Sequence, residues 1–430
     1  MRGIQRAFER LGVGMVAMLI GMVGWTAQPT LKQQTLVQGT TSSWRQVVPP
    51  PGEVGGEGYR LELPQADRKI PVVIVRGTPY QMGYHLGRLI RSEIHTFLPQ
   101  VLPKFKAALR VTDAQLREAW IRSAAYTDDR VEQELVGLAD GAQIPIEWLW
   151  QVQCFPLLLP YSCSSIAVWG KATKDGHLYQ TRDLDWNLQA KAHEFPVIVV
   201  YLPARGIPHV VPTFAGFVGA TCGMNMRGIV LSEMGDSPQR EAPYEVRAPH
   251  FTSWFRTILY DADRLSSALA IFRKQKLVKR YHFVFGDGQT EHRAVKIRLN
   301  AANPRSPQIQ IWHDQDPTDE WAPHVLPYVV YQDEGRGIFP FLKTHYGQLD
   351  GKRMIEAANR IPIRGGNVMD VVFDATALRL WVSYAHGTKE AYQLPYVFLD
   401  LKRLDGDHDG IPDLQEGVGQ NTSGGTSPGF

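Results

Sequence analysis

The order of its expected elements places this 430-residue chain in the α+β class. Helical patterns come first, over residues 78–105, 113–141 and 146–158. From residue 163 onward they give way to many short segments rich in β-branched and aromatic residues, with one helical stretch around residues 250–275. Helices followed by many strands predict helical layers packed on sheets rather than alternating βαβ units.

The amino-acid composition favours a packed soluble protein over a nucleic-acid-binding or disulfide-rich one. Hydrophobic residues make up 44% of the chain and charged residues 21%, which is typical of a packed soluble protein. The formal net charge is +3, and the lysines and arginines form no dense block, so we expect no nucleic-acid partner. Three cysteines are too few for a large disulfide framework.

The N-terminus has the pattern of a targeting segment. Arginines at positions 2, 6 and 10 precede the apolar run Leu11–Trp25, which is typical of a signal peptide. We therefore expect export to the periplasm, the extracellular space or the outer side of a membrane. Because the residues around Thr26 and Ala27 define a cleavage site poorly, residues 1–27 are read as either a signal peptide or a retained membrane anchor.

A change of composition separates the next two parts. Residues 28–58 are rich in Gln, Thr, Ser, Pro and Gly, which predicts a flexible linker before a folded domain over 59–402. Export permits a disulfide bond. If Cys163 is kept for catalysis, Cys154 and Cys222 are the pair that remains, and the sequence leaves their bonding open.

The first helix carries start signals and an unusual stripe of small residues. Thr78 is a suitable N-cap, with Pro79 at the first helical position. Spacings of three and four place four residues on one face: Tyr80, Gly83, Tyr84 and Gly87. Because glycine lowers helix propensity, we expect another backbone to approach closely there.

A hairpin pattern brings charged residues back toward a cysteine. Segments 164–170 and 177–186 are strand-like, and the polar loop between them contains Asp-Gly. Antiparallel pairing centred near Lys174 would place Cys163 opposite Asp185 and position 166 opposite Arg182. A turn centred on Asp-Gly itself would shift this register by a few residues.

This arrangement suits a thiol nucleophile. The thiolate is the reactive form, and a guanidinium such as that of Arg182 lowers a thiol pKa. No histidine lies close in sequence as a papain-like base, so we favour the α-amine of Cys163 itself, exposed by cutting the chain before it. The alternative is a buried structural thiol beside a structural Arg182–Asp185 ion pair.

Several motifs occur together in an order that resembles a known family. They are Cys163-Ser164-Ser165, the stretch Arg182–Trp186, the glycine-bearing helix 76–94, the turn Cys222–Gly235 and the segment Asn367–Gly387. Together they resemble the acyl-coenzyme A:6-aminopenicillanic acid acyltransferase family of N-terminal-nucleophile hydrolases. More distantly, the chain is similar to acid ceramidase and penicillin V acylase. The likeness covers most of residues 70–400.

The resemblance implies a four-layer αββα sandwich and self-cleavage between Ser162 and Cys163. Cleavage would leave a helical part, 59–162, and a β-rich catalytic part, 163–402. Cys163 would then attack an amide or thioester carbonyl, while Arg182 tunes the thiol and Asp185 holds the new amine. Ser162 departs from the glycine that is common before the nucleophile in this family.

Two further residues are candidates for stabilising the oxyanion. His282 stands in the strand before an Asp-Gly turn, where the resemblance implies an asparagine, and a histidine can also donate a hydrogen bond. Asn225, in the Gly-Met-Asn turn, is the second candidate. The alternatives are a satisfied core histidine and an asparagine that shapes its turn.

The C-terminal stretch 405–416 matches a twelve-residue calcium loop at every specified position. Its expected ligands are Asp405, Asp407, Asp409, Ile411 through its carbonyl, Asp413 and Glu416. We expect structural Ca²⁺ here and no cofactor for catalysis. The alternative is a solvated acidic segment, and residues 417–430 have the composition of a disordered tail.

These observations favour an exported, self-processing cysteine amidohydrolase or acyltransferase with a small acylated substrate. A different class, a secreted non-catalytic binding protein with the same fold and a calcium-binding tail, is the alternative. A papain-like protease would need a distal histidine that the sequence does not identify. The acyl group, the acceptor and the oligomeric state are left open.

Overall fold

The computed structural model describes residues 54–158, 162–234, 248–274, 281–299, 309–322, 324–332 and 337–404. All of them belong to one unit of the chain, Pro49–Phe430. The signal-like segment 1–27 and the calcium-loop motif 405–416 lie outside the described residues, so both stay predictions. Among the residues described, none of the helices is both long and apolar enough to cross a bilayer.

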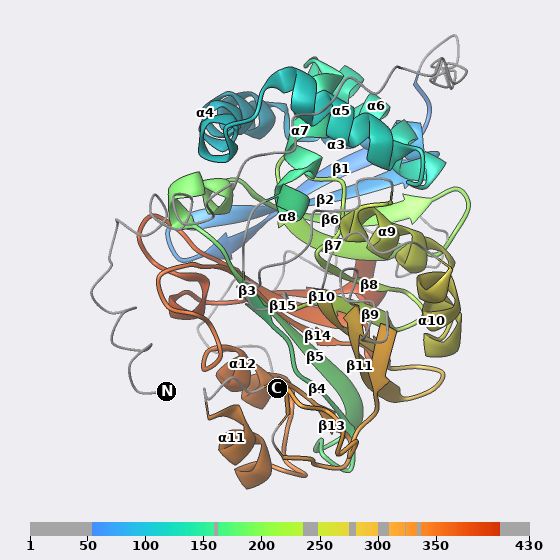
Figure 1. Ribbon diagram of the computed structural model, residues 1–430, viewed down its shortest axis with the longest axis vertical. Coiled ribbons are helices and arrows are strands. Elements are labelled where there is room, and N and C mark those ends of the chain that lie inside the picture. The colour runs from blue at the N-terminus through green and yellow to red at the C-terminus, as the bar shows by residue number, and fades with distance from the viewer. Residues whose placement is uncertain are drawn as a thin grey trace, which may run out of the picture. The chain divides into compact units, whose positions relative to one another are not determined.

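Two β-sheets form the centre of the fold (Figure 1). Within the described residues, sheet A has nine strands in the order β1 (Glu57–Gln65), β2 (Arg68–Gly77), β6 (Pro196–Pro203), β7 (His209–Phe214), β8 (Cys222–Asn225), β9 (Ile229–Glu233), β10 (Tyr281–Asp287), β11 (Arg293–Leu299) and β12 (Ile309–Trp312). Strands β2 and β6 run parallel, and the other neighbours run antiparallel. Sheet A therefore joins strands from both sides of position 163.

Sheet B carries the cysteine hairpin. Its strands follow the order β13 (Val329–Val330), β4 (Ala167–Gly170), β5 (Gly176–Asp185), β14 (Asn367–Asp374), β15 (Arg379–Tyr384) and β16 (Val397–Asp400), and β3 (Ser162–Ser164) also pairs with β5. Hydrogen bonds join the two sheets: Gln180 on β5 donates to Ser232 on β9, and the Tyr384 hydroxyl donates to the Val197 carbonyl of β6.

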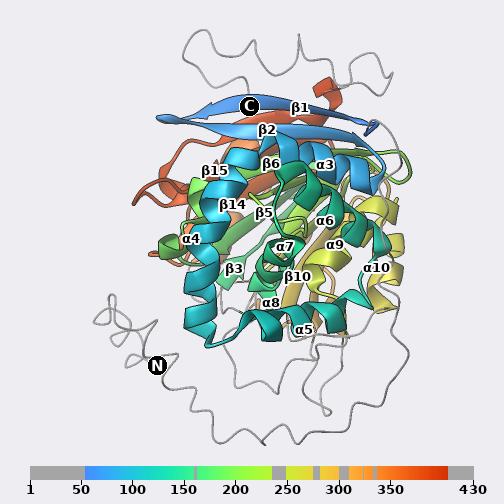
Figure 2. The ribbon, with the colours of Figure 1, turned by 90° about the horizontal axis from the view of Figure 1, so that it is seen from above.

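Helices cover the outer faces of both sheets (Figures 1 and 2). The helices on the side of sheet A are α3 (Pro79–Leu89), α4 (Arg91–Leu109), α5 (Asp113–Ala124), α6 (Asp129–Ala142), α7 (Ile146–Gln153), α8 (Phe155–Leu158), α9 (Phe251–Asp261) and α10 (Leu265–Arg273). Helices α11 (Ile338–Thr344) and α12 (Gly351–Ala358) pack on sheet B through a separate apolar cluster. The layer order is αββα, so the predicted fold class is confirmed.

Helix α3 starts and packs as its sequence indicates. Thr78 caps the helix and forms a capping box with Gln81, and Pro79 occupies the first turn. A Cβ added to Gly83 would lie 2.0 Å from the Glu134 carbonyl oxygen of α6. The glycine stripe therefore allows the backbones of α3 and α6 to touch, which is the close approach that the sequence predicts.

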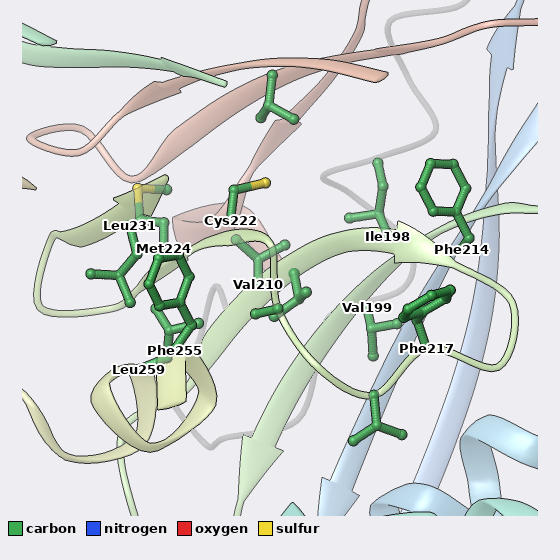
Figure 3. Packing of buried hydrophobic residues seen from close by; sticks show 14 of the residues in the cluster. Ile198, Val199, Val210, Phe214, Phe217, Cys222, Met224, Leu231, Phe255 and Leu259 are labelled. Atoms are coloured by element: carbon green, nitrogen blue, oxygen red, sulfur yellow. The ribbon is translucent and has the colours of Figure 1, made fainter. Parts of the chain in front are cut away.

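Apolar side chains fill two clusters on opposite faces of sheet B. The larger cluster includes residues from the facing strands of both sheets and from the helices over sheet A. Figure 3 shows part of it, where Cys222 and Met224 of β8 lie near Val210, Leu231 and the ring of Phe255. The smaller cluster lies between sheet B and helices α11 and α12. A strand of sheet B thus directs alternate side chains into different cores.

Several boundaries differ from the sequence expectations. Strand β1 begins at Glu57, two residues before the expected start of the domain, and the expected long helices break at Ile90 and over 125–128. Strands β1, β13 and β16 and helices α11 and α12 were not expected. The three cysteines are free thiols, so the structure shows no bond between Cys154 and Cys222.

Candidate active site

The hairpin brings Cys163 beside the expected strand, but the register is one residue away from the prediction. Cys163 pairs with Leu184, and Ser162 pairs with Asp185. The predicted pairing of Cys163 with Asp185 is therefore wrong. The loop turns between Gly170 and Gly176, and an irregularity between Val168 and Gly170 shifts the pairing again. A one-residue shift changes which side chains share a face.

Cys163 and Arg182 share the face that points toward sheet A. On that face Gln180 donates through Nε2 to Ser232 Oγ at 2.8 Å, and Arg182 follows Gln180 by the two-residue repeat of a strand. Cys163 pairs with Leu184, two residues beyond Arg182, and belongs to the larger apolar cluster. The thiol and the guanidinium therefore both face the space between the two sheets.

Glu233 completes this group from the other sheet. Its Oε2 lies 3.3 Å from Nη2 of Arg182, and both side chains are fully buried. Arg182 also donates through Nη1 to the Asp183 carbonyl at 2.5 Å and through Nε to the Thr221 carbonyl at 3.4 Å. Because Arg182 is held at three points, its charge is fixed in the interior.

The surroundings of Cys163 disfavour the thiolate form of its side chain. Burial raises its pKa well above the ordinary value, and the negative charges of Glu233 and Asp185 and a hydrogen bond to Glu233 raise it further. Arg182 lowers the pKa but does not offset burial. Cys163 is 4% exposed, so the expected activation by Arg182 does not dominate in this state.

Asp185 lies on the opposite face of β5, the face that looks toward α12. Its Oδ2 accepts from the Ile363 backbone at 2.7 Å, and its Oδ1 accepts from Asn367 Nδ2 at 3.2 Å. Cys163 on β3 pairs with β5 at Leu184, so it lies beside the stretch of β5 from which the Arg182 and Asp185 side chains leave on opposite faces.

A carboxyl pair lies behind Asp185. Asp183 faces Asp370 across β5 and β14, and Asn367 donates to Asp370 Oδ1 at 2.6 Å. Burial raises the pKa of Asp370 to about 8, and it raises the pKa of Asp183 well above its ordinary value. The nearby Arg182 lowers the pKa of Asp183 but does not offset burial and the facing carboxyl, so the pair favours a shared proton. Asp185 is linked to this pair through Asn367.

The two oxyanion candidates have different surroundings. Nδ1 of the buried His282 lies 3.2 Å from Gln332 Oε1, and its ring packs at 75° to Trp321 with 4.8 Å between centroids. Asn225 gives both amide N–H groups to backbone carbonyls, those of Leu259 at 3.1 Å and Ala262 at 2.8 Å. We therefore leave Asn225 out of the proposed catalytic set, because its bonds tie its turn to α9. An oxyanion role for His282 stays a prediction.

Glu233 is the residue that sequence reasoning missed. It closes the apolar strand segment 229–233, where a carboxylate is unexpected unless a cation pairs with it. A carboxylate at the end of an apolar strand was a usable signal in the sequence. The partner of Glu233, however, is Arg182, which is 51 positions away on the other sheet. Within the described residues, no group of three or more His, Cys, Asp or Glu side chains could hold a metal ion.

No family model matches this chain. Protein dcd1B of Dictyostelium discoideum is 24% identical over 290 residues, which are 62% of this chain and 56% of that protein. Protein dcd1A of the same organism is 23% identical over 382 residues, 76% of this chain and 81% of that protein. An uncharacterized protein of Archaeoglobus fulgidus is 22% identical over 246 residues, 50% of this chain and 41% of that protein. The matched region thus spans little more than half of dcd1B.

Solved structures with similar folds include three amide hydrolases. A Caenorhabditis elegans ortholog of N-acylethanolamine-hydrolyzing acid amidase has a TM-score of 0.38 at 14% identity and covers 55% of this chain and 100% of its own. Penicillin V acylase from Agrobacterium tumefaciens has a TM-score of 0.39 at 11% identity, with 56% and 87% coverage. A variant of conjugated bile acid hydrolase from Clostridium perfringens has a TM-score of 0.36 at 9% identity, with 56% and 92% coverage. At these scores, the fold assignment depends on the layer order and strand topology of this chain itself.

Proposed function

We propose that this protein is a self-processing cysteine amidohydrolase or acyltransferase that uses Cys163 as an N-terminal nucleophile. The observation that carries the proposal is the position of Cys163 on β3, paired with β5 and facing the same interior space as the buried Arg182–Glu233 ion pair. The αββα layers around it agree with the motif order in the sequence. Its substrate would be a small acylated compound with an amide or thioester bond.

Self-cleavage explains how a buried thiol could become a catalyst. In the uncut chain Ser162 and Cys163 both belong to β3, and the Cys163 thiol is buried. Breaking the Ser162–Cys163 bond would remove a covalent restraint on Cys163 and would create an α-amine with a pKa of about 7.7–8.0. This amine would exchange a proton with the thiol near neutral pH, because its pKa lies close to the working pH.

Arg182 and Asp185 would then have separate tasks. Arg182, held at three points, lowers the thiol pKa and favours the thiolate once burial is relieved. Asp185, already bound by the Ile363 amide and by Asn367, would orient the ammonium form of the new N-terminus. Attack of the Cys163 sulfur on the substrate carbonyl would give a thioester between enzyme and acyl group. Water would then hydrolyse this thioester, or an acceptor amine would take up the acyl group.

Intact-mass analysis of the purified full-length protein tests this proposal. We expect two fragments, the second beginning at Cys163. Cys163→Ala should remain uncut, whereas Cys154→Ala, which removes another buried thiol, should be cut like the wild type. Cleavage of Cys163→Ala at the wild-type rate would contradict self-processing by this sulfur.

One observation favours a second candidate function. Cys163 is 4% exposed and its pKa is raised, as expected of an inert structural thiol. On this reading the protein is a non-catalytic binding protein with the same fold. A wild-type protein that stays a single chain and turns over no N-acyl compound would support it. Export and a structural calcium site at 405–416 are proposed from the sequence alone.

A further inference from the structure

Self-cleavage needs a base before the proposed α-amine exists. In the uncut chain the nitrogen of Cys163 is an amide, so it cannot accept the thiol proton. We propose that Glu233 is the base that takes this proton in the self-cleavage step, an inference that rests on the proposed function. Glu233 would serve processing, and the α-amine would replace it in later turnover.

The geometry places Glu233 at the reacting sulfur. Arg182 on β5 shares the face of Cys163, and the Glu233 carboxylate lies 3.3 Å from the Arg182 guanidinium across the space between the sheets. Glu233 is near enough to Cys163 for its charge and its capacity to accept a hydrogen bond to raise the pKa of the thiol. All three side chains are buried, so a carboxylate already beside the thiol is better placed than bulk water to accept its proton.

The charged and titratable groups around Glu233 come from three strands. Arg182 comes from β5, Cys163 from β3, and Cys222 from the neighbouring strand β8. Arg182 supplies the positive charge that keeps a buried carboxylate ionised and able to accept a proton. Asp185 is less suited, because its side chain leaves the opposite face of β5 and accepts from Ile363 and Asn367.

Self-cleavage at Ser162–Cys163 is a hydrolysis of one peptide bond and consumes one water molecule. The Cys163 S–H proton passes to the Glu233 carboxylate while sulfur bonds to the Ser162 carbonyl carbon. The C–N bond then breaks, and the departing nitrogen takes the proton back from Glu233. This leaves a free amine on Cys163 and a thioester to Ser162. Water adds to the thioester, the C–S bond breaks, and the thiol is restored beside a new carboxyl terminus.

The proton transfer is uphill in the buried site, because the thiol pKa is raised and the carboxylate is stabilised by Arg182. Such a base cannot sustain rapid turnover. It can serve a reaction that each molecule performs once. A change of base after cleavage would therefore separate a slow maturation step from faster catalysis by the α-amine.

Glu233→Gln tests the proposal in the full-length chain. A positioned general base contributes about 10²–10⁴-fold, so we expect processing to slow by at least about 100-fold. Residual processing should rise about tenfold per pH unit, since hydroxide must then remove the thiol proton, whereas the wild-type rate should depend on pH less steeply. A structural role for Glu233 would not produce that change in the pH profile.

Glu134→Gln is the matched control. Glu134 forms another fully buried ion pair, with Nη2 of Arg256 2.8 Å from its Oε2, in the interface between α6 and α9. Its neutralisation leaves an equally buried arginine unpaired, but it should leave processing unchanged. Glu233→Asp keeps a carboxylate and should process measurably faster than Glu233→Gln.

Four outcomes would overturn the proposal. Glu233→Gln could process as fast as the wild type or faster, in which case Glu233 only holds the thiol protonated. Glu134→Gln could slow processing equally, or folded Glu233→Asp could be no faster than Glu233→Gln. An uncut wild type would remove both this inference and the proposed function, whereas the first three outcomes remove only the role of Glu233.

Discussion

At the scale of single residues, burial determines what the titratable groups do. Cys163 and Arg182 lie in one hairpin, so the sequence could place them together. Their burial, and the pairing of Arg182 with Glu233, depend on the opposing sheet and could not be predicted from a local pattern. The same limit applies to Asp183, whose partner Asp370 comes from β14.

The Asp183–Asp370 pair predicts a pH dependence of stability. The folded pKa of Asp370, about 8, lies above the unfolded value of about 3.9. Between these values the folded state binds more protons than the unfolded chain, so the free energy of unfolding falls as pH rises, by up to about 1.4 kcal/mol per pH unit for each proton. Asp370→Asn should flatten this slope and be more stable than the wild type at pH 8.

Urea unfolding at pH 5, 6, 7 and 8 measures the slope. Asp67→Asn, at a side chain 82% exposed, should keep the wild-type slope and serves as the control. An unchanged slope in Asp370→Asn would show that the buried pair does not gain a proton on folding.

At the scale of elements, the sequence predicted whether a segment is a helix or a strand better than it predicted strand register and element boundaries. The cap of α3 and its glycine stripe use local rules, and both agree with the structure. The hairpin register failed by one residue because the irregularity between Val168 and Gly170 is not visible in the Asp-Gly signal. A strand of two residues such as β13 carries no periodicity, since it exists through its pairing with β4.

The contact between α3 and α6 gives a prediction about packing. Gly83→Ala should raise helix propensity by about 1 kcal/mol. The added methyl would lie 2.0 Å from the Glu134 carbonyl oxygen, and such overpacking costs about 1–3 kcal/mol or more. Because the contact is with backbone, we expect net destabilisation by about 1–2 kcal/mol, with α6 displaced beside the buried Glu134–Arg256 pair.

Chemical denaturation of Gly83→Ala against the wild type measures this change. Ser92→Ala, on the exposed side of α4, should alter stability by less than about 0.5 kcal/mol. If Gly83→Ala were more stable than the wild type, the two helices would move apart at little cost. The gain in helix propensity would then exceed the cost of overpacking.

At the scale of the whole molecule, the α+β class was predictable from the order of helical and strand patterns, whereas the αββα order of layers was implied by the resemblance of the motifs. The strand order inside sheet A was not predictable. Strand β2 lies next to β6, and their parallel pairing connects residues more than 100 positions apart. Such contacts depend on tertiary packing, which periodicity alone does not encode.

This topology predicts that the two products of cleavage at Ser162–Cys163 stay together. Strands β1 and β2 belong to the first product but complete sheet A beside β6 of the second, and the buried Glu134–Arg256 pair joins α6 to α9 across the same divide. Separation would expose strand edges and an unpaired buried charge. Cleaved protein should therefore elute as one particle in native size-exclusion chromatography and give two bands on a denaturing gel. Two native peaks would mean that the interface between the products is far weaker than its backbone pairing and burial imply.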